Sequence, residues 1–146
     1  MILFNDFILE YQSIKENIDK AIQKVLDRGW YILGSEVEKF EEALADYLGM
    51  KYCVGVASGT DALTLSLMAN EIGQNDEVIT TNFTAYPTIT GIINAGATPI
   101  LADIMLENAL IDPVAVEKKI NSRTKAIISV HLYGQCCEMD AILNIA

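Results

Sequence analysis

The sequence is short of basic residues, and it has no long apolar run. Ten Lys and Arg stand against twenty Asp and Glu in 146 residues, which gives a net charge of −10. A nucleic-acid-binding protein needs a basic surface that neutralises phosphates, so nucleic acid is not expected as a partner. No apolar run reaches the length of a membrane-spanning helix, and the apolar residues 1–4 are too few for a signal peptide.

Cysteine is also scarce. Cys53, Cys136 and Cys137 give neither an even disulfide framework nor a C-x-x-C pair. We therefore expect a reduced, cytoplasmic protein with no membrane association. A metal site is not expected, because the sequence offers one histidine and no second cysteine pair, and Cys136 and Cys137 are interpreted as inert.

What the sequence does contain is a change of pattern near residue 50. Before it, apolar residues recur at helical spacing over 10–28 and 35–48, with Ser35 and Glu38 placed as a capping box. After it, short apolar segments alternate with helical ones. Strands are expected at 52–57, 77–80, 98–102 and 125–130, and helices at 60–69, 84–95, 112–120 and 138–146. This alternation predicts an α/β fold with a mostly parallel sheet flanked by helices.

The turn from Ser58 to Asp61 joins a predicted strand to a helix. The first N–H groups of a helix lack internal acceptors and lie at the positive end of its dipole, so they form an anion site. Gly59 allows a ligand to approach the backbone closely, and Thr60 adds a hydroxyl donor. Residues 62–69 are apolar almost all round, which predicts a buried helix. The alternative is a plain turn in which Ser58 or Thr60 only caps the helix.

Seven segments along the chain occur in a characteristic order. They are Trp30–Glu41, Ala57–Leu63, Asp76–Thr80, Ala95–Ile100, Arg123–Ile128, Val130–Gln135 and Met139–Ile142. Together they resemble the DegT/DnrJ/EryC1/StrS family of nucleotide-sugar aminotransferases, which depend on pyridoxal 5′-phosphate (PLP). The resemblance covers essentially the whole chain but only the N-terminal part of the family's sequence.

The resemblance implies the aspartate-aminotransferase fold (PLP fold type I), with this chain forming part of the large domain. It predicts an N-terminal helix and interface loop over residues 1–34 and an incomplete α/β PLP-binding domain over 35–146. It also implies a homodimer with active sites at the subunit interface. The family transfers an amino group, usually from glutamate, to a keto-sugar linked to a nucleotide, with PLP as the electron sink.

By resemblance, Gly59, Thr60 and Asp61 supply the contacts to the cofactor phosphate. Many relatives carry the aromatic ring that covers the cofactor at the position of Ala85, so Phe83 or Tyr86 is expected to replace it. Packing of both rings in the core is the alternative.

His131, the only histidine, follows a predicted strand at its carboxyl end, where ligands gather in α/β proteins. The resemblance places it in the lining of the active site, and a hydrogen-bonded core histidine is the alternative. Trp30 and Tyr31 lie on a loop that forms an interface, a substrate mouth or a local core plug.

In the family the Schiff-base lysine and the aspartate beside the pyridine nitrogen both lie downstream of the segment Val130–Gln135. This sequence ends at Ala146, before either would be expected. Ser122 and Lys125 have the S-x-x-K spacing, but Lys125 is interpreted as a surface lysine at the start of a strand. We therefore expect no catalytic residue and no activity from this chain alone. A fragment of a sugar dehydratase of the same family, or a non-catalytic fragment that self-associates, is the alternative.

Overall fold

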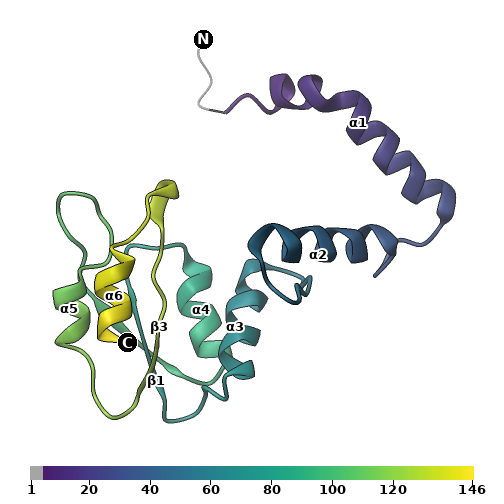
Figure 1. The fold of residues 1–146 in the computed structure, drawn as a ribbon. Coiled ribbons are helices and arrows are strands. Elements are labelled where there is room, and N and C mark those ends of the chain that lie inside the picture. Colours follow the sequence, from purple (N-terminus) through teal and green to yellow (C-terminus); the bar gives the residue numbers. More distant parts are fainter. Residues whose placement is uncertain (1–4) are drawn as a thin grey trace. The chain divides into compact units, whose positions relative to one another are not determined.

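The computed structural model describes residues 5–146, in two compact units that meet between Gly55 and Val56 (Figure 1). Residues 5–55 are called the helical unit and residues 56–146 the α/β unit. The apolar start of the chain, residues 1–4, lies outside the described residues. The division falls later than the domain boundary predicted after residue 34, which concerned the family's complete fold and stays a prediction.

The helical unit contains α1 (Phe7–Arg28) and α2 (Ser35–Leu48). Asp6 caps α1 by accepting a hydrogen bond from the N–H of Leu9 at 3.0 Å, so the helix begins at Phe7, three residues ahead of the predicted start. The capping box predicted at Ser35 is wrong, because Gly34 is the N-cap of α2 and offers no side chain. The Ser35 hydroxyl instead lies beside Arg28 and Glu36, which form an ion pair.

The α/β unit follows the predicted alternation closely. Its elements are α3 (Gly59–Ala69), β1 (Glu77–Thr81), α4 (Tyr86–Asn94), β2 (Thr98–Ala102), α5 (Pro113–Glu117), β3 (Thr124–Ile127), η1 (Leu132–Gly134) and α6 (Met139–Ile145). The three strands form a parallel sheet in the order β2-β1-β3. The predicted mostly parallel α/β architecture is therefore confirmed.

Strand β1 is the centre of the sheet, and all five of its residues are buried. Its successive side chains point to opposite faces. Val78 packs with Leu67 and Ile92 under α3 and α4, whereas Ile79 packs with Val116 and Ile142 under α5 and α6. Figure 1 shows the two helix pairs on the two faces of the sheet, so the unit has three layers.

The strand predicted at 52–57 does not form among the described residues. A strand exists only where a neighbouring strand pairs with it, and residues 52–57 pair with none of the three strands of the sheet. Tyr52 and Val54 are 75% and 76% exposed, although the sequence reads as a buried strand.

Helix α3 is less buried than its apolar sequence predicts. Leu67 is its only buried residue, and Leu65 and Met68 are 48% and 55% exposed. The covered side of α3 contacts α4 at Gly91, where an added Cβ would lie 2.9 Å from the Cβ of Leu63. The helices approach this closely because glycine has no side chain.

This close approach predicts that Gly91→Ala destabilises the α/β unit. The extra methyl group overpacks the helix contact, which typically costs about 1–3 kcal/mol and exceeds the gain of about 1 kcal/mol in helix propensity. Urea denaturation followed by circular dichroism measures the change. Gly59→Ala is the matched control, because a Cβ there meets nothing within 4 Å. Equal unfolding midpoints for the two variants would contradict the close packing.

Candidate functional site

The predicted site residues lie at one edge of the α/β unit. Helices α3 and α4 begin at the end of the unit where β1 and β3 finish (Figure 1). Gly59 and Tyr86 open the two helices, Phe83 lies just after β1, and His131 follows the segment that continues β3. The carboxyl edge of a parallel sheet is where α/β proteins bind ligands, so the topology brings these residues to a suitable place.

The start of α3 has the features of an anion site. Ser58 is the N-cap, and its Oγ accepts a hydrogen bond from the N–H of Asp61 at 3.1 Å. The N–H groups of Gly59 and Thr60 have no acceptor among the described residues. Space around the Cα of Gly59 is open. Two free N–H groups at the positive end of an eleven-residue helix suit a phosphate.

Asp61 has a second contact in the same turn. Its Oδ2 lies 2.9 Å from the Oγ of Ser58, so the hydroxyl donates to the carboxylate while it accepts from the backbone. Capping by Ser58, which the sequence left as an alternative to ligand binding, is therefore present together with the free donors. Helix capping by Ser58 and anion binding are compatible, because the cap uses the N–H of Asp61 and leaves the N–H groups of Gly59 and Thr60 available to a ligand.

The aromatic candidates are both accessible. Phe83 is 46% exposed, and its backbone N–H donates to the Oγ1 of Thr81 at 3.2 Å, which shapes the turn after β1. Tyr86 is 81% exposed at the first position of α4. The alternative that both rings pack in the core is therefore wrong. Either ring is free to cover a ligand, and no contact distinguishes them.

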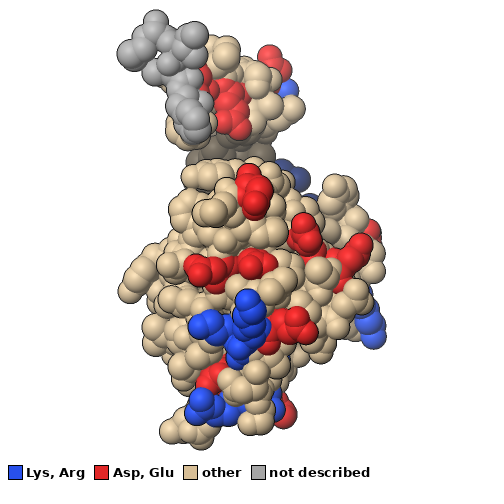
Figure 2. Space-filling model, turned by 90° about the vertical axis from the view of Figure 1, so that its left-hand side faces the viewer, with Lys and Arg blue, Asp and Glu red and all other residues tan. Residues whose placement is uncertain are grey.

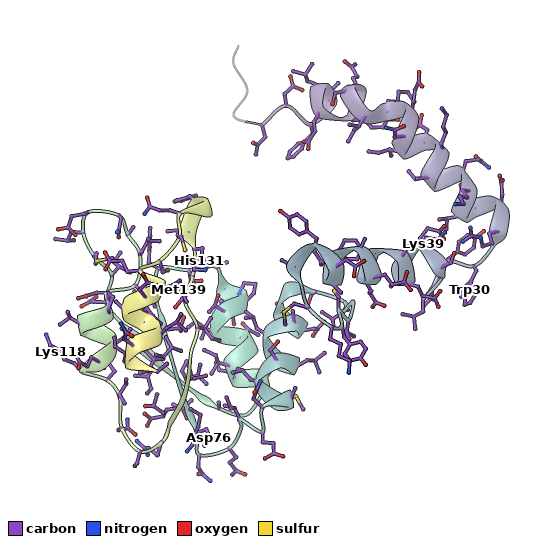
Figure 3. All side chains as sticks on the ribbon, in the orientation of Figure 1. Trp30, Lys39, Asp76, Lys118, His131 and Met139 are labelled. Atoms are coloured by element: carbon purple, nitrogen blue, oxygen red, sulfur yellow. The ribbon has the colours of Figure 1, made fainter. Side chains whose placement is uncertain are left out.

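His131 is exposed, so the alternative of a core histidine is wrong for its side chain. Its Nδ1 accepts a hydrogen bond from the backbone N–H of Cys137 at 3.1 Å. No motif or spacing in the sequence predicts this contact, and the interpretation of Cys137 as inert does not include it. Figure 3 shows His131 on the segment that leads from β3 into η1, with Met139 at the start of α6.

Charge around the molecule is mixed and mostly acidic. Among the described residues visible in Figure 2, Lys and Arg side chains lie beside Asp and Glu without merging into a continuous basic surface. No helix in residues 5–146 has both the length and the hydrophobicity needed to cross a membrane. Within the same residues, no three His, Cys, Asp or Glu side chains gather as metal ligands.

The sequence model of one family matches residues 12–146. The chain belongs to the DegT/DnrJ/EryC1/StrS aminotransferase family. Among curated relatives, it is 49% identical to a dTDP-3-amino-3,6-dideoxy-alpha-D-galactopyranose transaminase of Aneurinibacillus thermoaerophilus. It is 48% identical to a UDP-2-acetamido-2-deoxy-3-oxo-D-glucuronate aminotransferase of Pseudomonas aeruginosa. Both alignments cover 100% of this chain but only 40% and 41% of the relatives.

Solved structures of family members have the same fold over this part. DesV of S. venezuelae, in complex with a ketimine intermediate, matches 99% of the chain with a TM-score of 0.94 and 40% identity. NtdA of Bacillus subtilis, with bound cofactor PMP, matches 92% with a TM-score of 0.87 and 35% identity. The chain covers 39% and 31% of those two chains. The α/β unit is thus part of the fold of PLP-dependent aminotransferases.

The double role of Ser58 predicts that Ser58→Ala destabilises the chain by about 0.5–2 kcal/mol, since an N-cap hydroxyl is lost. The free energy of unfolding, obtained from urea denaturation, measures the effect. Ser66→Ala is the matched control, because it makes the same change at an exposed position inside α3. A Ser58→Ala variant as stable as the control would show that the cap is not formed.

Proposed function

We propose that this chain is the N-terminal portion of a cytoplasmic, PLP-dependent aminotransferase that acts on a nucleotide-linked keto-sugar in deoxysugar or surface-polysaccharide synthesis. One observation carries the proposal: in a chain of this family, the start of α3 offers two N–H groups without acceptors. The printed functions of the relatives, transaminases of dTDP- and UDP-linked sugars, supply the substrate class.

The residues present suit the phosphate end of PLP. The N–H groups of Gly59 and Thr60, with the Thr60 hydroxyl, are hydrogen-bond donors beside open space. Phe83 or Tyr86 would cover the cofactor ring, and His131 would line the site. When bound, PLP supplies the electron sink for amino transfer. In this proposal the residues of the chain bind and orient the cofactor. None of them is assigned the role of the Schiff-base lysine or of the ring aspartate.

The sheet supports the view that more protein completes this domain. The connection from β2 to β3 crosses β1 with α5 on one face, and α6 follows β3 on that same face. Connections between parallel strands are right-handed, so a strand after α6 belongs beyond the free edge of β3. A groove of about 680 Å³ lies along that edge, between β3 and α3, and Leu63, Leu67 and Ile127 are among its lining residues.

A non-catalytic fragment that self-associates is the second candidate, and the exposed apolar surface favours it. Helix α1 has no buried residue, and Phe7, Ile8 and Leu26 on it are more than half exposed. The loop that follows is similar, with Trp30 and Tyr31 56% and 65% exposed, so it is not a local core plug. Apolar area of this extent is typical of surfaces that bind protein.

The phosphate site predicts that PLP binds the chain without a covalent bond and perturbs the backbone amides of Gly59 and Thr60 in NMR spectra. Thr60→Val should weaken binding roughly fivefold, the effect of losing one hydrogen bond of about 1 kcal/mol. Thr90→Val, the same change in α4, is the control.

With PLP, glutamate and a keto-sugar nucleotide, the chain alone should show no turnover. Unperturbed amides at saturating PLP would contradict the phosphate site, and measured turnover would contradict the predicted inactivity of the chain.

The exposed apolar surface predicts that the chain is a dimer or larger oligomer in solution. Size-exclusion chromatography with light scattering at micromolar concentration measures the mass directly. Replacing Ile8 and Leu26 on α1 by Gln should shift the mass toward the monomer, because it removes apolar area. Glu16→Gln, at an exposed polar position of α1, is the control. A monomeric wild-type chain would refute self-association.

A further inference from the structure

Cys137 joins the two ends of the segment between β3 and α6. The side chain of Cys137 is 4% exposed and packs in the core with Ile111 and Ile142. Its Sγ lies 3.2 Å from the backbone oxygen of Val130, to which the thiol donates. Its backbone N–H donates to the Nδ1 of His131 at 3.1 Å. One buried residue therefore contacts both the backbone at Val130, beyond the end of β3, and the imidazole of His131.

The hydrogen bond from Cys137 has a chemical consequence for His131. A ring nitrogen that accepts a hydrogen bond carries no proton, so Nδ1 is unprotonated. In that tautomer the ring proton is on Nε2, which is a donor. Because His131 is exposed, this donor is available at the carboxyl edge of the sheet.

We propose that Cys137 is a positioning residue: it holds the imidazole of His131 in the tautomer whose Nε2–H donates to an oxygen of the bound cofactor. This role in ligand contact rests on the proposed function, whereas the tautomer is a property of the chain alone. It makes His131 a hydrogen-bond donor rather than a base acting through Nδ1. The thiol does not need to react.

The surroundings of Cys137 suit a fixed support. Burial raises the pKa of the Cys137 thiol, which keeps its proton available for the Val130 oxygen. The chain between His131 and Cys137 turns tightly, since Tyr133 and Gly134 both have positive φ. The backbone N–H of Gly134 also donates to the backbone oxygen of His131 at 3.1 Å. Cys136, next in sequence, is exposed and makes none of these contacts among the described residues.

The tautomer can be read without any substitution, because His131 is the only histidine. We expect the imidazole nitrogens in 15N NMR spectra at neutral pH to show an unprotonated Nδ1 and a protonated Nε2. In His131→Ala, the amide of Cys137 should exchange with solvent roughly fivefold faster, since it loses one hydrogen-bond acceptor. The amide of Ile128, which donates to Ile79, is the internal control. A proton on Nδ1, or unchanged exchange at Cys137, would overturn the proposal.

Two variants separate the N–H of Cys137 from its thiol. Cys137→Ala keeps the N–H and should keep the Nε2–H tautomer fixed. Cys137→Pro removes the N–H, so the imidazole should sample both tautomers. If Cys137→Pro does not fold, Cys137→Ala and the exchange measurement on His131→Ala still decide the question. Loss of the fixed tautomer in Cys137→Ala would assign the support to the thiol and refute the role of the N–H.

Binding is tested with PLP and with inorganic phosphate on the wild-type chain. A change in the Nε2–H signal with PLP supports donation to the cofactor, and a matching change with phosphate identifies the phosphate as acceptor. No change with bound PLP overturns the donor role. If the amides of Gly59 and Thr60 also stay unperturbed, PLP is not bound and the proposed function fails. The tautomer of the free chain is measured independently of both outcomes.

Discussion

The α/β unit depends on the complete burial of β1. All five of its residues pair with β2, and Glu77, Val78 and Ile79 also pair with β3. The strand is covered on both faces, so the alternation of Val78 and Ile79 separates the two helix layers. Because β2 and β3 both run parallel to it, the ends of β1 and β3 and the starts of the following helices come to one edge. Three parts of the candidate site follow from this arrangement: the turn at Phe83, the start of α4 and the segment that carries His131.

Where the sequence predicts the fold well, the information is local. The apolar segments of β1, β2 and β3, and the helices that begin near Asp6, Ala85 and Asp112, are recognisable because caps, prolines and apolar spacing act over a few residues. The predictions that fail concern segments whose structure depends on residues distant in the sequence. Residues 52–57 have the composition of a buried strand, but a strand requires a partner that the described residues do not provide. Helix α3 is exposed for the same reason, since its outer side lacks a covering element.

The candidate site divides in the same way. Helix geometry alone predicts an anion site at Gly59 and Thr60, and only the family resemblance turns the anion into the phosphate of PLP. The accessibility of Phe83, Tyr86 and His131 is a matter of packing, and the sequence left it open. The contact between Cys137 and His131 joins residues six apart through a turn with positive φ at Tyr133, and no spacing rule predicts such a turn. An unreactive buried residue such as Cys137 is recognised as a support only from its contacts in the structure.

A partial site of this kind can still recognise part of its ligand. The donors at the start of α3 belong to the backbone, and the packing of α3 on α4 holds them in place. In the proposed function the ring nitrogen and the aldehyde carbon are different, because none of the residues assigned to the site is proposed to hold them. Phosphate binding and amino transfer are therefore separable in that proposal: the first requires a correctly started helix, whereas the second requires side chains other than those assigned to this site.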